Sequence, residues 1–241
     1  MKIKTFKFKK SINLYCFTDI HIGAKDHDAV KFKKAIDSLK KDPNGYCFFN
    51  GDNLEFTPGG HHGATNEQNK SNTDQIKEFI DLVKSLGKKV LFFRTGNHEA
   101  RAADLCDVHI YDVLSNTLGI PELHRGMEEV HFYIGKRKIR LVSTHGEGGS
   151  SKRALQNMQL TIPGADVYFT GHTHEFFVNE GNETIDTSTG DEIKKGQLEI
   201  VGGSFLGWAD YARSKNMRPT KTGCYVLKFD EEGASVKGRI V

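Results

Sequence analysis

The chain has 241 residues, 27% of them charged and 37% hydrophobic, and this is the composition of an ordinary globular protein. The length suits one α/β domain with a sizeable core, so residues 1–241 are predicted to form a single domain. A net charge of +3 does not by itself indicate nucleic-acid binding, and the apolar run at 14–17 is too short for a signal peptide or membrane span, so we expect a cytoplasmic protein.

Short apolar segments of strand length recur along the chain, and each ends in a polar cluster rich in Asp, His, Asn and Gly. The five pairs of segment and cluster are 14–17 before Asp19 and His21, 46–49 before Gly51 and Asp52, 90–93 before Gly96, Asn97, His98 and Glu99, 139–142 before His145, and 167–169 before Gly171, His172 and His174. In open α/β sheets, ligands bind just beyond the carboxyl ends of the strands. The five clusters are therefore predicted to converge on one edge and form a site.

Helical patterns lie between the first three strands. Apolar residues recur at the helical period over 29–39 and over 76–83. Pro43 is predicted to stop the first helix, and Gly87 is placed to end the second. A third helix is predicted over 100–118, ended by Gly119. Residues 197–201 are predicted to form a strand and 223–241 a hairpin that turns near 231–233. This mixture predicts an α/β fold in which two stacked mixed sheets are flanked by helices.

The polar clusters together offer a mixed set of nitrogen and oxygen ligands. These are Asp19, His21, Asp52, Asn97, His145, His172 and His174. Such donors suit Mn, Fe, Zn, Co or Ni better than Mg or Ca. Seven ligands are too many for one tetrahedral ion but suit two ions that share a carboxylate. Each residue alone is more often a surface or turn residue, so the prediction depends on the complete set following five strands.

The cysteines do not point to a thiolate metal site. Cys16, Cys47, Cys106 and Cys224 include no CxxC pair, and three of them lie in apolar surroundings. We therefore expect reduced cysteines that pack as small hydrophobic side chains.

The ordered clusters resemble the signature of the calcineurin-like metallophosphoesterase superfamily. That signature reads Asp-x-His, Gly-Asp, Gly-Asn-His-Glu, His and Gly-His-x-His, and all five parts occur here in that order over residues 19–174. The resemblance implies a four-layer α/β/β/α sandwich. It also implies a hydrolase that cleaves phosphate esters by metal-activated hydroxide, with two divalent transition-metal ions. We favour Mn, with Fe, Zn, Ni and Co as alternatives.

The resemblance also assigns roles to the residues. One metal would be held by Asp19, His21, Asp52 and His174, and the other by Asp52, Asn97, His145 and His172, with Asp52 bridging. His98 is not a ligand, and it would protonate the leaving oxygen as a general acid. Glu55 lies where phosphatases of the superfamily carry an aspartate that orients the catalytic histidine, so it would either orient His98 or be a simple loop carboxylate.

The departures from the superfamily bear on the substrate. Ser/Thr protein phosphatases carry an arginine directly before Gly-Asn-His-Glu, where this chain has Thr95, so phosphoproteins are disfavoured. Arg101, Arg153 and Trp208 are candidate substrate contacts. The Gly-rich insert at 57–72 is either a lid or a loop without such a role. The segment 208–218 mixes aromatic and basic residues, as nucleic-acid grooves do, but ordinary surface packing also explains it.

Three functions follow from these residues. We weakly favour a phosphodiesterase that acts on nucleotides or nucleic acid. The alternatives are a phosphomonoesterase for a small metabolite and, in a different class, a non-catalytic metal-binding scaffold for a protein partner. Scaffolds of the superfamily tend to lose metal ligands or the histidine, and this chain has lost none of them. No membrane partner is expected, and the sequence does not determine the oligomeric state.

Overall fold

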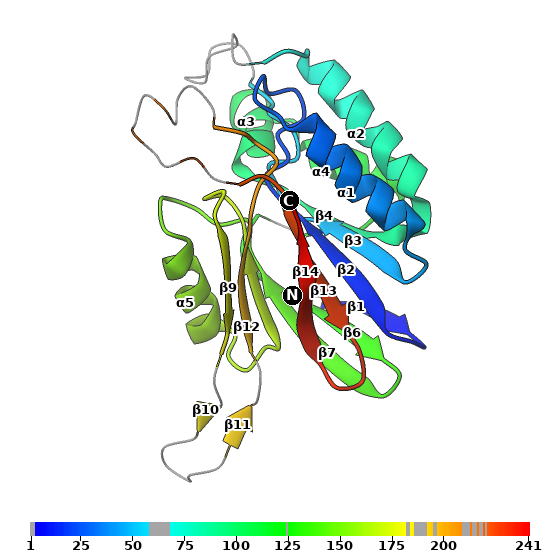
Figure 1. Ribbon diagram of the computed structural model, residues 1–241. Coiled ribbons are helices and arrows are strands. Elements are labelled where there is room, and N and C mark those ends of the chain that lie inside the picture. Colours follow the sequence, from blue (N-terminus) through cyan, green and yellow to red (C-terminus); the bar gives the residue numbers. More distant parts are fainter. Residues whose placement is uncertain are drawn as a thin grey trace.

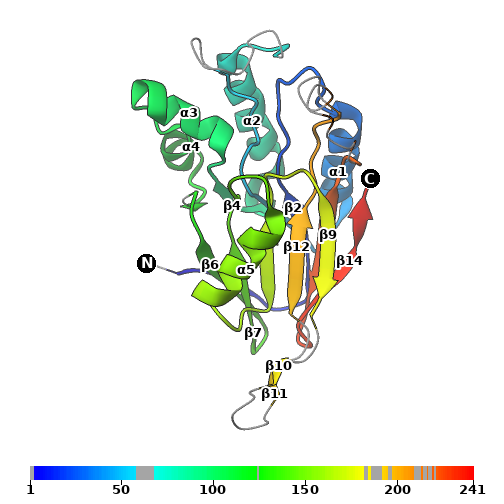
Figure 2. The ribbon, with the colours of Figure 1, turned by 90° about the vertical axis from the view of Figure 1, so that its left-hand side faces the viewer.

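Two six-stranded sheets lie face to face between layers of helices in the computed structural model (Figure 1). The structure describes residues 3–57, 68–123, 125–181, 184–185, 192–194, 197–208, 213, 216, 219 and 221–241. Helices α1, α2 and α4 lie outside one sheet and α5 lies outside the other, which confirms the predicted α/β/β/α sandwich (Figures 1 and 2). Within the described residues, no helix is long and apolar enough to cross a membrane.

The first sheet has the strand order β1-β6-β7-β8-β12-β9. Its strands are β1 (Lys4–Phe8), β6 (Glu128–Ile134), β7 (Arg137–Ser143), β8 (Val167–Thr170), β12 (Leu198–Gly202) and β9 (Phe176–Glu180). The pairs β1–β6, β7–β8 and β8–β12 are parallel, whereas β6–β7 and β9–β12 are antiparallel. A short ribbon of β10 (Thr184–Ile185) and β11 (Glu192–Lys194) projects from the bottom of the molecule in Figure 1.

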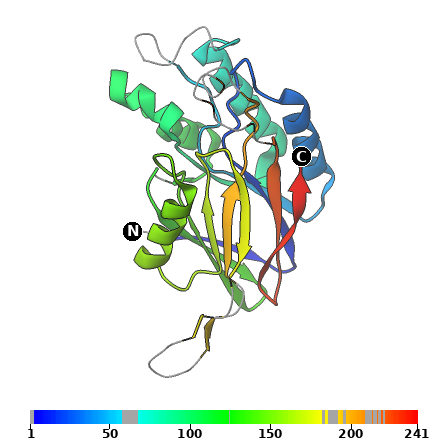
Figure 3. The same ribbon diagram turned by 60° about the vertical axis from the view of Figure 1, so that its left-hand side comes forward.

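The second sheet has the strand order β14-β13-β2-β3-β4-β5. Its strands are β14 (Ala234–Ile240), β13 (Cys224–Phe229), β2 (Ile12–Phe17), β3 (Gly45–Phe49), β4 (Val90–Arg94) and β5 (Glu122–Leu123). Strands β2 to β5 are parallel, and β13 joins β2 and β14 in antiparallel pairs. The predicted C-terminal hairpin is confirmed, and its strand β14 lies beside α1 in Figure 3.

Two helices cover the parallel strands as the sequence predicts. Helix α1 (Ala29–Lys41) begins after Asp28, whose side chain accepts a hydrogen bond from the backbone of Lys31. Helix α2 (Asn72–Leu86) begins after Ser71 and ends at Gly87, whose φ of 55° is left-handed. Each helix turns its apolar stripe toward the sheet, which explains why the periodic pattern marked both of them.

Three hydrophobic clusters fill the spaces between the layers. The cluster between the sheets contains Phe48, Phe92, Phe132 and Phe169, none of them exposed to solvent. A second cluster lies under α1, α2 and α4, and a third lies where α5 (Ser151–Thr161) covers the first sheet. Because side chains from both sheets share the central cluster, its packing fixes one sheet relative to the other.

The single helix predicted over 100–118 is wrong. The structure has α3 (Asn97–Cys106) and α4 (Ile110–Leu118), separated at Asp107, whose φ is 54°. Aspartate tolerates this left-handed conformation, and here the backbone N–H of Asp107 donates to the carbonyl of Ala103 at 3.1 Å to end α3. The break directs α4 back onto the second sheet. The sequence pattern also missed β1, β6, β9 and α5.

A buried arginine links the two sheets. Arg94, at the end of β4, donates from Nε to Asn50 Oδ1 at 3.1 Å and from Nη2 to the backbone and side-chain oxygens of Ser143 at 2.9 Å each. Its Nη1 donates to the carbonyl of Gly126. Burial lowers the pKa of Arg94 to about 10, so the guanidinium stays charged at neutral pH. The guanidinium therefore serves the packing of the sheets rather than a substrate.

We expect Arg94→Met to lower the free energy of unfolding by about 2–4 kcal/mol, because buried acceptors would lose their charged donor. Urea denaturation followed by circular dichroism measures this change. Lys138→Met, on the exposed part of β7, is the control and should change stability by no more than about 0.5 kcal/mol. Equal stability of the two variants would show that Arg94 does not stabilise the contact between the sheets.

Candidate metal centre

All seven predicted ligands lie shortly after the ends of strands. Asp19 and His21 follow β2, Asp52 follows β3 and Asn97 opens the helix after β4, all in the second sheet. His145 follows β7, and His172 and His174 follow β8, both in the first sheet. The structure therefore brings together ligand turns from both sheets at one edge of the sandwich.

One group of ligand atoms forms around His174. Its Nε2 lies 3.2 Å from His21 Nε2 and 3.4 Å from Asp19 Oδ1. These three side chains converge closely enough to hold one ion, with all ligand atoms within 4.8 Å of one another. A cation between these two imidazole nitrogens would accept the lone pairs of both.

A second group forms around His145. Its Nε2 lies 3.1 Å from Asp52 Oδ2 and 3.1 Å from Asn97 Oδ1, and His172 Nδ1 lies 2.8 Å from the same Asn97 oxygen. Asp52, His145 and His172 could hold one ion together. Asp52 also forms a group with His21 and His98, so it lies between the two predicted metal positions. The donors in both groups fit divalent transition-metal ions.

Five of these residues have a left-handed backbone. Among the described residues other than glycine, φ is positive at eight positions, and five of them are Asp19, His21, Asp52, His172 and His174. Each such conformation costs on the order of 1 kcal/mol, and strain of this kind gathers at functional sites. The strained backbone therefore supports the interpretation of these turns as a binding site.

Two signature glycines permit close approach of the turns. A side chain at Gly96 would overlap Asp52, and one at Gly171 would overlap Thr18 and lie 2.5 Å from Asp19 Oδ2. The backbone N–H of His172, next to Gly171, donates to that same Asp19 oxygen at 2.9 Å. Glycine at both positions therefore lets one turn pack against the carboxylate of another.

The carboxylates and imidazoles change each other's protonation. Burial by itself lowers the pKa of His145, but the nearby Asp52 and Asp19 carboxylates outweigh burial and raise it to about 9. Burial opposes ionisation of Asp52, yet His145 and His98 hold its pKa well below the usual value. The ligands therefore carry both negative charge and a bound proton at neutral pH.

Glu99 is a buried residue for which the sequence indicated no role. Its Oε2 accepts from the backbone N–H of Asp52 at 3.1 Å and of Gly96 at 2.9 Å, and its Oε1 accepts from that of Leu54 at 2.9 Å. Burial, and then the Asp52 charge, raise the pKa of Glu99 to about 7. Its place three residues after Gly96 matches the capping box at a helix start, which could have revealed this contact.

The Glu55 carboxylate is closer to a predicted ligand than to His98. Its Oε2 lies 2.8 Å from His21 Nδ1, whereas Oε1 lies 3.7 Å from His98 Nδ1. The backbone carbonyl of Glu55 instead accepts from His98 Nδ1 at 2.5 Å. Glu55 therefore contacts both histidines, one through its side chain and the other through its backbone.

His98 faces an arginine on its other side. Arg101 Nη2 donates to His98 Nε2 at 3.0 Å, and because a guanidinium only donates, this contact assigns the His98 proton to Nδ1. Burial lowers the pKa of His98 to about 4, which agrees with a neutral ring. Arg101 is therefore placed beside the predicted acid, as a substrate contact would be.

Of the other predicted substrate contacts, Arg153 lies in α5 and Trp208 lies in the loop after β12. Arg153 lines a cavity next to His145. The loop before Trp208 packs on Asp19, since Phe205 N–H donates to the Asp19 carbonyl at 2.9 Å. Trp208 itself is 41% exposed, and the Arg213 guanidinium lies 5.2 Å from its ring centre. Most of the predicted lid, with His61 and His62, and the basic and aromatic residues Tyr211, Lys215 and Arg218 lie outside the described residues.

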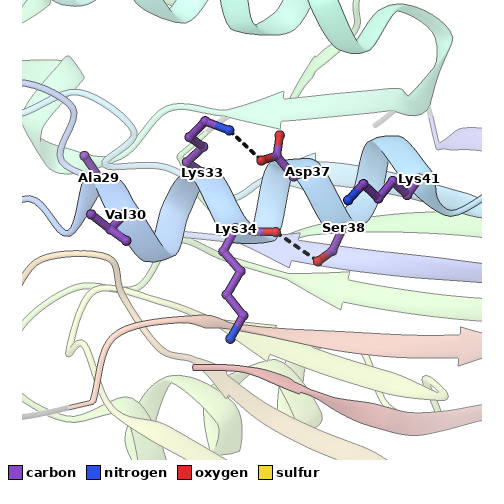
Figure 4. Close-up of a pocket in the computed structure, with 7 residues that line it drawn as sticks. All are labelled: Ala29, Val30, Lys33, Lys34, Asp37, Ser38 and Lys41. Atoms are coloured by element: carbon purple, nitrogen blue, oxygen red, sulfur yellow. Dashed lines mark hydrogen bonds and ion pairs between the residues drawn. The ribbon is translucent and has the colours of Figure 1, made fainter.

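A hollow of about 560 Å³ against α1 contains none of these residues (Figure 4). Lys33 pairs there with Asp37 at 2.6 Å, and Ser38 Oγ donates to the Lys34 carbonyl at 2.9 Å. These are ordinary contacts of an exposed helix, and we assign no chemistry to this hollow.

The model for the calcineurin-like phosphoesterase family matches residues 12–176, more than half of the chain, and this confirms the resemblance drawn from the signature. The matched segment contains all seven predicted ligands, His98 and Glu55. No curated protein matches the chain.

Solved structures with a similar fold are distant in sequence. Calcineurin-like phosphoesterase YfkN from Bacillus subtilis is 13% identical over 97% of this chain and 90% of its own, with a TM-score of 0.50. The phosphoesterase YfcE from E. coli is 16% identical over 95% and 98%, with a TM-score of 0.48. Vacuolar Protein Sorting 29 from Cryptosporidium parvum is 17% identical over 95% and 98%, with a TM-score of 0.49. The likeness to YfkN bears on the fold alone.

We expect Mn²⁺ binding at pH 7 to release about one proton, because His145 holds a proton below its pKa of about 9 and must lose it to bind metal. The affinity should rise between pH 6.5 and about 9, as neutral His145 becomes more abundant. In metal-free protein, the stability that protonated His145 contributes is complete below its ordinary pKa and is lost as the pH rises through about 9. Calorimetry in buffers of different ionisation enthalpy counts the protons.

Asp52→Ala should abolish this binding, and Mn²⁺ should then no longer raise the melting temperature. In the parent, metal at 100 times its Kd should add about 2.7 kcal/mol to the free energy of unfolding. His131→Ala, on β6 and outside the ligand groups, serves as the control and should retain the shift. Undiminished binding by Asp52→Ala would exclude Asp52 as a shared ligand.

Proposed function

Because the chain belongs to the calcineurin-like phosphoesterase family, we propose that it hydrolyses phosphate esters at a centre of two divalent transition-metal ions. The observation that carries the proposal is the pair of ligand groups, one around His174 and one around His145, with Asp52 between them. The ions are proposed to be Mn²⁺, with Fe, Zn, Ni and Co as alternatives that the same donors suit.

The proposed ligand sets follow the signature. Asp19, His21, Asp52 and His174 would hold one ion, and Asp52, Asn97, His145 and His172 would hold the other. When bound, two such ions supply Lewis acidity and a nucleophile at neutral pH. The backbone carbonyl of Asn50 accepts from His145 Nδ1 at 2.8 Å, and this directs the Nε2 lone pair of His145 toward the centre.

We propose His98 as the general acid and Arg101 as its partner at the phosphate. The Glu55 carbonyl holds Nδ1, so Nε2 is the atom that would meet the leaving oxygen. Arg101 would transfer its hydrogen bond from His98 Nε2 to the substrate phosphate, for which a guanidinium is well suited. The negative phosphate would raise the pKa of His98, so that Nε2 takes up a proton and passes it to the leaving oxygen.

The Glu55 carboxylate has a different proposed role from the one that the superfamily suggests. At 2.8 Å from His21 Nδ1, it holds the proton of His21 on that nitrogen and leaves Nε2 free for metal. Glu55 would act on His98 through its backbone carbonyl, and any other residue at position 55 would keep that carbonyl. Glu55 is therefore proposed as a positioning residue for the metal ligand His21.

A phosphodiester of a nucleotide or nucleic acid is the proposed substrate class. Arg101 and Arg153 offer positive charge on two sides of the ligand groups, and Trp208 with Arg213 offers an aromatic and a basic group at the end of a loop whose Phe205 contacts Asp19. A small phosphomonoester is the alternative substrate. A scaffold without catalysis is disfavoured, because the chain keeps every signature ligand and His98.

We expect His98→Ala to retain its metals and to hydrolyse an alkyl phosphodiester about 10²–10⁴-fold more slowly, because a poor leaving group needs a proton. The loss should be much smaller for bis(p-nitrophenyl) phosphate, whose leaving group is stable as an anion. Turnover of both esters with Mn²⁺ measures the effect, with Asp52→Ala as the inactive control. Undiminished hydrolysis of the alkyl ester would exclude His98 as the acid. Faster cleavage of p-nitrophenyl phosphate than of the diester by the parent would favour the monoesterase alternative.

Glu55→Gln should weaken Mn²⁺ binding about 10–100-fold at the His21 group, because the amide holds the imidazole proton less firmly than the carboxylate does. Calorimetry should resolve a weakened site beside an unchanged one. Glu129→Gln is the matched control, because Glu129 pairs with His131 at 2.7 Å on β6, away from the centre. Equal metal binding by both variants would contradict the positioning role.

A further inference from the structure

A cavity of about 670 Å³ lies beside the ligand His145. Thr144 and Gly146, the chain neighbours of His145, both line it, and a side chain added at Gly146 would lie 3.2 Å from His172 Cβ. Arg125 and Arg153 also line the cavity, and Glu147 is the one acidic residue among its described lining residues. The space therefore lies next to one half of the proposed metal centre, and two guanidinium groups border it.

The two arginines have little other use within the protein. In the described part of the chain, the Arg153 guanidinium forms no hydrogen bond or ion pair, and only its backbone N–H is used, by Ser150 Oγ. Arg125 Nη2 lies 3.6 Å from Glu147 Oε1, and that Glu147 side chain is 86% exposed, so the pair is weak. By contrast, the guanidinium of the buried Arg94 donates hydrogen bonds to acceptors within the protein. Arg125 and Arg153 are therefore available to an anion.

Glycines with no side chain form part of the cavity wall. The loop after His145 has glycines at 146, 148 and 149, and side chains added at Gly148 or Gly149 would meet nothing within 4 Å. The loop leads into α5, which has no acidic residue in its first turn. Small residues here leave room for a ligand, and the helix start adds to the positive field of the arginines.

Two other cavities near the centre have different linings. One of about 490 Å³ beside α3 and α4 shares Arg125 but is also lined by Asp104, Asp112 and Glu122. Another of about 400 Å³ is lined by Lys152, Lys221 and Arg239 together with Glu175, and the Arg239 guanidinium lies 5.5 Å from the centre of the Phe176 ring. Of these three cavities, only that of Arg125 and Arg153 is lined by two guanidinium groups of the described residues.

We propose that this cavity binds a second phosphate group of the substrate, while the scissile phosphate lies at the metal ligands. The proposal rests on the proposed phosphoesterase function and narrows its substrate to molecules with two phosphates, such as a nucleoside bisphosphate ester or an oligonucleotide. Arginine suits this role because its planar guanidinium donates two hydrogen bonds to one phosphate. Arg125 and Arg153 are specificity residues in this proposal.

Two matched substrates test the subsite: the p-nitrophenyl ester of thymidine 5′-phosphate, and the same ester with an added 3′-phosphate. With Mn²⁺, the parent should show a KM about tenfold lower for the ester with two phosphates, because charged hydrogen bonds hold the second one. In Arg125→Gln/Arg153→Gln, this KM ratio should fall to about one. Lys152→Gln removes the same charge one residue away, at a different cavity, and should keep the ratio of the parent.

Calorimetry with thymidine 3′,5′-bisphosphate and thymidine 5′-phosphate separates binding from turnover. The subsite is supported if the parent binds the bisphosphate more tightly, the double variant loses this preference and Lys152→Gln keeps it. This holds even if neither ester is cleaved, because failure to cleave contradicts only the phosphoesterase function. Equal KM values and equal affinities in the parent overturn the subsite while hydrolysis itself stands. A ratio lost in Lys152→Gln as well would reduce the effect to general surface charge and would also overturn it.

Discussion

The candidate centre depends on a buried polar contact between the two sheets. Arg94 at the end of β4 binds Asn50 after β3 and Ser143 at the end of β7. Asn50 in turn donates to the Thr144 carbonyl at 2.8 Å and accepts from His145 Nδ1 at 2.8 Å. A buried network of this kind has few arrangements that satisfy every group, so it sets how the ligand turns of one sheet face those of the other.

The same turns carry local conformational cost. The left-handed backbone at Asp19, Asp52 and His172 is unfavourable by itself. In addition, the Asp19 and Asp52 carboxylates lie close enough to repel each other when both are ionised. The Glu99 and Asp19 carboxylates accept hydrogen bonds from the backbone N–H groups of Asp52 and His172, and these bonds hold the turns in place. A protein that only needed a stable fold would gain by relaxing such turns, whereas a cation at the centre offsets both the strain and the negative charge. The geometry thus favours a binding centre over a structural explanation.

The surroundings of the centre differ from side to side. The His21 side is closed by the Glu55 carboxylate, and His98 is held between the Glu55 backbone and Arg101. On the other side, the cavity with Arg153 lies next to the buried His145. One side therefore holds the groups that would orient ligands and move a proton, while the other has room and positive charge for the rest of a substrate.

The sequence by itself determined the layered α/β class, both helices over the parallel strands, the family and the positions of the ligand turns, because these depend on local periodicity and on a motif in fixed order. It did not determine the break at Asp107, the partner of the Glu55 carboxylate or the cavity at Arg125. These depend on which residues come together across long separations: His21 pairs with Glu55, and Arg125 and Arg153 line one cavity. Only the packing of the two sheets decides such contacts, because a side chain's partner depends on distance in space and not on spacing along the chain.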